Sequence, residues 1–416
     1  MHDNWGLWSI NTYPNQRHLM LGGTMILVLM TLFLPNLIDM FENRKGLKIK
    51  EKIKKFAFSK TAFITKNGDK RFLISLLIVM MLPYFHGSAL ITALLILFGM
   101  AIFSENRLSY LAVAIVAVIF SIMQTTLFSG GAGNVVGISI EPGFMAPGRS
   151  MFEILKYIFT VTGLLFLVAF LYLLINRKAY HFVLFFAFLL PVIFAFVFKL
   201  TVEIAANHKF ITYATFLFDI FAASFITYTM IPISKESSTS KRKLVYSILS
   251  IIRFFAGLII LVVMTLTGIY EWIIFINKNK YTIQVPIGSE MQEWIITNTN
   301  NEDMFLTPMW SIHDFFLAGR PSFFGWPYYA FSAGHDTDSR GKLFEYLLSG
   351  AEEDRDNFVN ICKEYKIKYF IDSDEYIDNL REAAPRGVFY NLRFIENNFE
   401  MVAEFEYNNT RIFKIY

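Results

Sequence analysis

Residues 19–41, LMLGGTMILVLMTLFLPNLIDMF, are followed directly by residues 42–71, ENRKGLKIKEKIKKFAFSKTAFITKNGDKR. The first segment is apolar and long enough to cross a bilayer, which takes about 20 helical residues. The second segment holds 11 Lys and Arg, and the positive-inside rule places such a loop in the cytoplasm. The pair therefore predicts a membrane protein whose N-terminus lies outside the cytoplasm.

Composition and charge point the same way. The 416 residues are 55% hydrophobic and 17% charged, with 45 Phe, which is more apolar than a soluble globular chain needs. Residues 277–416 carry 14 Lys and Arg against 22 Asp and Glu, a net charge of −8, and residues 1–276 carry 24 against 12, a net charge of +12. The cations lie in short loops between apolar runs, so membrane topology explains them and we expect no nucleic-acid partner.

The apolar runs predict a membrane all-α bundle of about eight transmembrane helices within residues 1–276, near 19–41, 72–85, 88–103, 108–128, 152–175, 181–203, 211–233 and 246–276. The break at Pro83, His86 and Gly87 predicts two short spans or a re-entrant hairpin, and both return the chain to the side it left. Every basic loop then falls inside the cell. The predicted localisation is the cell membrane, multi-pass, with the N-terminus and the C-terminal domain extracytoplasmic.

From about residue 277 the apolar residues fall into short blocks, which indicates a separate soluble domain over 277–416. Residues 305–306 and 368–371 resemble buried strands, 338–349 and 352–366 show helical spacing, and Asn408-Asn409 fits a hairpin turn. We expect a small α/β or α+β domain. The single cysteine, Cys362, excludes an internal disulfide, and we expect it to be a small buried side chain.

Ionisable residues near the predicted outer leaflet are the first candidates for function, because charges inside a bilayer are costly. We predict an outward-facing polar cavity in which Asp219 and Glu203 are catalytic carboxylates. Lys199, His208 and Lys209 would bind a lipid-linked phosphate there. The alternatives are a helix-packing carboxylate for Asp219, an interfacial ion pair for Lys199 and Glu203, and an ordinary wet loop for His208 and Lys209.

In the soluble domain, residues 318–340 mix glycines, aromatic residues and charges. Aromatic faces stack on sugar rings while polar groups bond to hydroxyls, so the candidates for binding sugar or acceptor are Arg320, Trp326, His335, Asp336 and Arg340. The alternative is that this segment forms the turn and core that join the domain to the membrane part. No metal-ligand spacing, P-loop, dinucleotide fingerprint or nucleophile elbow is present.

A polytopic membrane part, an intramembrane acid and an external α/β domain together resemble the GT-C superfamily of membrane glycosyltransferases. The residues that carry this resemblance are Asn15-Gln16-Arg17-His18, Asn207-His208-Lys209-Phe210, Trp294, Asn298-Thr299, Phe305-Leu306-Thr307, Gly319-Arg320, Gly325-Trp326, Gly334-His335-Asp336, Arg340, Tyr365 and Tyr369. They cover most of the chain. The resemblance implies sugar transfer from a polyprenyl-phosphate-linked donor to an extracytoplasmic acceptor, with membrane lipid and that donor as partners.

One departure from the superfamily bears on the partners. Its members place an acidic catalytic residue in the first outer loop, after an initial span, whereas Asp3 is the only acid before residue 19 here. We therefore expect the chain to correspond to the C-terminal half of a split or truncated protein, completed by a separate N-terminal-half membrane subunit. The alternatives are a transporter or flippase-like protein and a cell-envelope scaffold. The sugar, the acceptor and any need for a divalent metal stay open.

Overall fold

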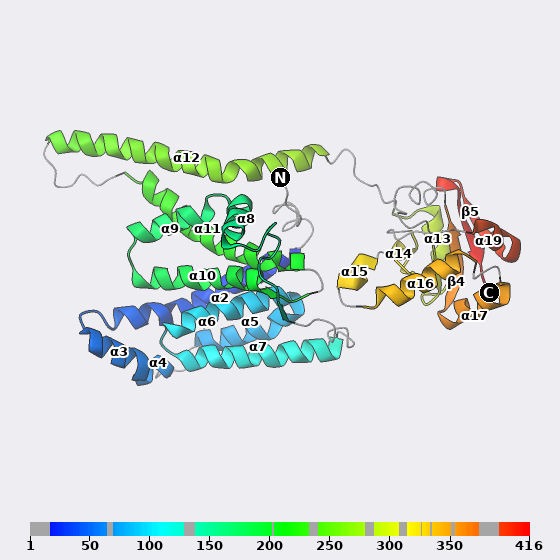
Figure 1. Ribbon diagram of the computed structural model, residues 1–416, viewed down its shortest axis with the longest axis horizontal. Helices are drawn as coiled ribbons and strands as arrows, with labels where there is room; N and C mark the ends of the chain where they lie inside the picture. Colours follow the sequence, from blue (N-terminus) through cyan, green and yellow to red (C-terminus); the bar gives the residue numbers. More distant parts are fainter. Residues whose placement is uncertain are drawn as a thin grey trace. The chain divides into compact units, whose positions relative to one another are not determined.

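The computed structural model divides the chain into two compact units, Met1–Lys280 and Tyr281–Tyr416 (Figure 1). We call them the helical unit and the sheet unit and describe each by itself. The structure describes residues 17–64, 70–128, 138–201, 204–232, 240–278, 287–307, 314–325, 327–332, 335–350, 354–373 and 391–416.

Among the described residues of the helical unit, five helices are long and apolar enough to cross a membrane. They are α2 (Arg17–Glu42), α7 (Arg107–Phe128), α10 (Ala179–Val197), α11 (His208–Met230) and α12 (Ser240–Lys278). The expected total of about eight spans is not confirmed. At 1.5 Å per residue, the 16-residue helices α5 (Lys70–Phe85) and α6 (Gly87–Ile102) are about 24 Å long, which is shorter than a hydrocarbon core of about 30 Å.

The segment 152–175 is not the single straight span that its hydropathy predicts. It forms two helices, α8 (Met151–Thr162) and α9 (Leu165–Ile175), whose axes differ by 91°. Gly163 lies at the bend with φ of 59°, a conformation that glycine adopts without the steric cost of a side chain. The bend makes α8 and α9 a broken span or a re-entrant pair.

The helices of the helical unit pack side by side (Figure 1). Helix α2 packs on α5 and α6, α10 on α6 and α11, and α11 also on α9 and α12. Gly22 permits a close approach of α2, because a Cβ there would lie 2.6 Å from the Tyr213 hydroxyl and 2.7 Å from Ala89 Cβ. The bundle has two ends, which we call the histidine end, holding His18 and His86, and the Arg44 end. Short helices α3 (Ile49–Phe58) and α4 (Lys60–Phe63) follow α2 at the Arg44 end.

The sheet unit is built on a four-stranded mixed sheet with the order β3-β4-β6-β5. Strand β3 (Met304–Leu306) runs parallel to β4 (Ile367–Asp372), while β6 (Thr410–Lys414) is antiparallel to both β4 and β5 (Glu400–Phe405). The expected hairpin is present, and Asn409 in its turn η6 (Tyr407–Asn409) has φ of 44°, which asparagine tolerates better than most residues.

The central strands β4 and β6 are buried on both faces, while the edge strand β5 is mostly exposed. Successive strand residues point to opposite sides of the sheet, so the two faces belong to different cores. Phe370 and Phe413 belong to one core with helices α16 (Thr337–Leu348), α17 (Arg355–Glu364) and α19 (Leu392–Asn398). Tyr369 and Ile412 belong to a second core with α13 (Glu290–Asn298) and α14 (Asp314–Leu317). The sheet therefore separates two helical layers.

Cys362 lies in the first of these cores and is 0% exposed. Burial raises the pKa of its thiol to about 12, because the thiolate is disfavoured away from water. We therefore expect no reaction with a thiol reagent between pH 7 and 9 in the folded protein, and one labelled thiol per chain after denaturation, counted by mass spectrometry. Full labelling of the native protein at pH 8 would contradict this placement.

Candidate functional site

Three histidines converge at the histidine end of the helical unit. His18 lies in the first turn of α2, His86 caps α6, and His208 begins α11. The rings of His18 and His86 have centroids 4.8 Å apart, and the Tyr213 hydroxyl lies 3.1 Å from His86 Nδ1. His86 and His208 are buried, with 6% and 8% exposed. Three separate helices thus bring polar rings to one place among apolar side chains.

Local hydrogen bonds set the tautomers of the two buried histidines. The backbone N–H of Ala89 donates to His86 Nδ1 at 3.2 Å, so this nitrogen carries no proton and Nε2–H is the donor of the neutral ring. His208 shows the opposite arrangement, because its Nδ1 donates to the carbonyl of Ala205 at 2.8 Å. His86 can therefore offer a ring N–H to a bound group.

Lys209 is the cation of this site. It is partly buried and forms no ion pair with any residue that the structure describes. It is close enough to His18, His86 and His208 to act on each through its charge. A partly desolvated ammonium group without a carboxylate beside it is suited to bind an anion, since charge-assisted hydrogen bonds to phosphate oxygens are short and strong.

Asn207 fixes the position of His208 and Lys209. Its side chain is 1% exposed, and its amide donates to the carbonyls of Ala195 and Phe198. These bonds tie the short helix η3 (Ile204–Asn207) to the end of α10. The start of α11 is therefore held by buried hydrogen bonds rather than by a loop exposed to water.

Lys199 has a different partner from the one its spacing predicts. The expected helix through residue 203 is wrong, because α10 ends at Val197 and β2 (Phe198–Lys199) then pairs with β1 (Ser139–Ile140). Lys199 Nζ lies 3.3 Å from Glu141 Oε2, so its charge is already balanced. Glu203, the other member of the expected pair, lies outside the described residues.

Asp219 is separated from the histidine end. It lies 11 residues after His208 in α11, which corresponds to about 17 Å along the helix axis. Its side chain is on the surface of the helical unit. Asp219 is therefore well separated along α11 from His208 and Lys209, with which we expected it to share a cavity, and its catalytic role stays a prediction.

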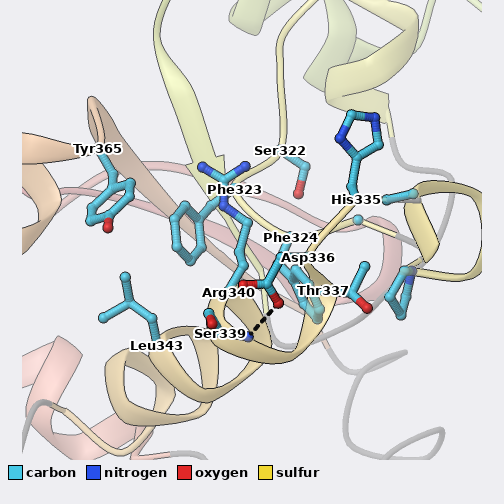
Figure 2. A pocket seen from close by; sticks show the side chains of 13 residues that line it. Ser322, Phe323, Phe324, His335, Asp336, Thr337, Ser339, Arg340, Leu343 and Tyr365 are labelled. Atoms are coloured by element: carbon cyan, nitrogen blue, oxygen red, sulfur yellow. Dashed lines mark hydrogen bonds between the residues drawn. The ribbon is translucent and has the colours of Figure 1, made fainter. Parts of the chain in front are cut away.

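The sheet unit contains a pocket of about 560 Å³ that brings together His335, Asp336 and Arg340 (Figure 2). Figure 2 shows the Arg340 guanidinium beside the Phe323 ring, whose centroid is 4.9 Å away, and Tyr365 also lines this side. Arg340 forms no ion pair with a described residue. The aromatic faces and the guanidinium group together suit an anionic or hydroxyl-rich ligand.

Asp336 has a structural role in this pocket, as the N-terminal cap of α16. Its carboxylate accepts the backbone N–H groups of Asp338 and Ser339, each at 3.1 Å, and so caps α16 (Figure 2). Hydrogen bonds from the side chain and backbone of Ser339 lower the pKa of Asp336. Asp336 is therefore ionised at neutral pH and engaged with the helix, while His335 and Arg340 keep their side chains available at the pocket.

A further predicted residue, Arg320, is buried inside the sheet unit rather than placed at the pocket. Arg320 is 6% exposed, and its guanidinium donates to Thr299, Asn301 and the carbonyl of Ala318 at 2.7–2.8 Å. Its donors are used inside the sheet unit, so we assign Arg320 a structural role in place of sugar binding. Trp326 lies outside the described residues.

Sequence reasoning did not single out His18, His86 or Tyr213 as site residues. The signal available was that three histidines each stand at the predicted outer end of an apolar run. Among the described residues no group of three or more His, Cys, Asp or Glu side chains is arranged to hold a metal ion. Comparison with protein-family models finds no match to the chain, and comparison with curated proteins finds no significant relative.

Proposed function

We propose that the protein binds a polyprenyl-phosphate-linked sugar at the histidine end and takes part in transferring the sugar to an acceptor outside the cytoplasm. The observation that carries this proposal is Lys209, a partly buried cation beside three histidines with no carboxylate partner among the described residues. Lys209 and the Nε2–H of His86 would bind phosphate oxygens there.

The surroundings of the site suit a lipid tail. Helix α8 begins at this end. Arg149, two residues before α8, contacts Glu141, which also pairs with Lys199. It keeps apolar side chains on its surface, with Phe152 76% and Phe159 59% exposed. Exposed apolar side chains on a short bent helix fit the boundary between headgroups and acyl chains. We propose that the isoprenoid chain lies along this surface, with the sugar on the water side.

Catalysis needs a further group in this proposal. Inversion or retention at a sugar carbon calls for a carboxylate as base or nucleophile, and the described residues place none in an ion pair with Lys209. We propose that Glu203 or an acid of a separate N-terminal-half subunit supplies it, and that the pocket at Arg340 binds the acceptor.

The same observation favours a second candidate function. A cationic site without a carboxylate beside it can hold and release a lipid phosphate without breaking a bond. A flippase-like or scaffold protein of the cell envelope would use the histidine end in this way, with the pocket of the sheet unit as a contact for glycan.

The test is a transfer assay with the full chain in proteoliposomes. Radiolabelled polyprenyl-phosphate sugar is supplied with a mixture of glycan and peptide acceptors, with and without a membrane extract that can contribute a missing subunit. Label in the acceptor supports the transferase. Label moved across the vesicle membrane without bond formation supports the flippase-like function. Failure of the donor to bind at all would end both.

Orientation is tested separately. We expect a cysteine introduced at Tyr407, which is 65% exposed, to react with an impermeant thiol reagent on intact cells, because the positive-inside rule sends the sheet unit outside. Because Cys362 is buried, we expect it to add no background labelling by the thiol reagent. Lys50→Cys, in the lysine-rich segment, is the matched control and should react only after permeabilisation. The reverse pattern would overturn the proposed location of both sites.

A further inference from the structure

Asp219 lies at the centre of α11. It is 11 residues from His208 at one end of the helix and 11 from Met230 at the other, or about 17 Å from each. The helix is a candidate membrane span with a mean hydropathy of 1.6. A carboxylate at this position is therefore at mid-membrane depth, and its short side chain cannot reach either headgroup layer.

The side chain of Asp219 points away from the bundle. It is exposed on the helical unit, and Ile220, 49% exposed, and Ala223 continue the same uncovered face at helical spacing. No described residue gives Asp219 a hydrogen bond or an ion pair. In a membrane this carboxylate would face hydrocarbon, where an unpaired ionisable group is costly.

Helix α12 packs on α11 and leaves this face exposed. Gly257 of α12 lies at Thr229, and Ile260 and Met264 pack against the bundle core, while Asp219, Ile220 and Ala223 stay exposed; of the most apolar stretch of α12, within Leu244–Ile274, only 6% is buried. Lipid can cover the apolar surface of α12, but lipid tails cannot pair with a carboxylate. The Asp219 carboxylate therefore needs a polar partner, whereas the apolar surface of α12 needs only lipid.

We propose that the face of α11 formed by Asp219, Ile220 and Ala223 docks a transmembrane helix of a different membrane protein, which places a Lys or Arg opposite Asp219. The small Ala223 allows a close approach of that helix. Asp219 lacks a positive charge beside it among the described residues. The apolar surface at Ile220 suits contact with another helix rather than with a water-soluble ligand.

Within the part of the chain that the structure describes, a second copy offers no cation at this depth. In the described apolar helices the Lys and Arg residues lie near helix ends, in the short helix α8 or, for Arg253, beside the end of α11, where it bonds to the carbonyl of Tyr228. The others are Arg17 in α2, Lys70 and Arg71 in α5, Arg107 in α7, Lys156 in α8, Lys209 in α11, and Lys241, Arg242, Lys243 and Lys278 in α12. None lies at the depth of Asp219. The partner is therefore a different chain.

The experiment places a photocrosslinking amino acid, p-benzoylphenylalanine, at Ile220 in the full chain, expressed in the cells that naturally produce it. The matched control carries it at Ile193 of α10, which is 54% exposed on another face. We expect one adduct of discrete mass from position 220 and none of that mass from 193. Asp219→Asn, which keeps the shape but loses the charge, should reduce the adduct at least tenfold.

Charge exchange makes the test specific. Asp219→Lys should abolish the adduct, and Lys→Asp or Arg→Asp in the crosslinked partner should restore it. An adduct with the mass of two copies, crosslinks to lipid only, or an adduct unchanged by Asp219→Asn would each overturn the proposal. Unchanged thermal unfolding of Asp219→Asn shows that the variant folds. Binding of the lipid-phosphate donor through Lys209 is measured in parallel, so the two proposals fail independently.

Discussion

Replacing Lys209 by methionine is expected to weaken binding of a polyprenyl-phosphate sugar about 10- to 100-fold. A hydrogen bond to a charged group contributes about 1.5–3 kcal/mol, and each 1.4 kcal/mol is a factor of ten in affinity. Lys209 is a cation at the histidine end that forms no ion pair with a described residue, whereas Lys199 is balanced by Glu141 at 3.3 Å. Binding is measured by titrating fluorescent donor into proteoliposomes.

The matched control for this prediction is Lys178→Met. Lys178 is exposed and precedes α10 at the opposite end of the helical unit from the histidines. It should leave the affinity unchanged. Equal losses in both variants would mean that the donor is attracted by overall charge, and an unaltered affinity in Lys209→Met would remove the central observation from the proposed function.

Glu105→Ala is expected to destabilise the helical unit by about 3–5 kcal/mol, the usual cost of leaving one partner of a buried ion pair without the other. Arg44 Nη1 lies 2.8 Å from Glu105 Oε1, and the two side chains are only 8% and 10% exposed. Arg44 also donates to the carbonyl of Met40 at 2.9 Å. The pair joins the end of α2 to the start of α7, so its loss should loosen both. Unfolding of the reconstituted protein by SDS measures the change.

An exposed pair in the same region provides the comparison. Glu42 and Lys45 form an ion pair with side chains 45% and 71% exposed, and exposed pairs contribute about 0–1 kcal/mol. Glu42→Ala should therefore shift the unfolding curve little. Comparable losses for Glu42→Ala and Glu105→Ala would show that net charge at this end, rather than the buried pair, sets the stability.

The buried Arg44–Glu105 pair also shows which contacts could not be predicted from the sequence. Arg44 is one of eleven cations in the lysine-rich segment, and nothing in the local sequence distinguishes it from Lys45. It is distinguished by Glu105, 61 residues away. The same holds at the histidine end, where Tyr213 reaches His86 across 127 residues. Hydropathy reports which segments enter the membrane, but it carries no information on which side chains meet between them.

The predictions that the structure corrects failed for local reasons. Such local features are lost when hydropathy is averaged over a window of residues. A run of 24 apolar residues predicts one span, yet Gly163 permits a 91° bend within it. The spacing of Lys199 and Glu203 fits a helix, yet the chain leaves the helix at Val197 because β2 pairs with β1. In the sheet unit, Arg320 and Arg340 look alike in sequence, but one is enclosed by backbone carbonyls and the other lines a pocket.

The sequence by itself determined that the chain has apolar helices long enough to cross a membrane and a C-terminal segment of a different composition, because the transfer of apolar side chains from water depends on composition and segment length. Only the tertiary structure decided which polar residues share a site. It joined His18, His86, His208 and Lys209, and it left Asp219 apart on an uncovered face. The physical reason is that such sites depend on the packing of helices distant in sequence, and packing is set by side-chain shape and close approach, as at Gly22, rather than by hydropathy.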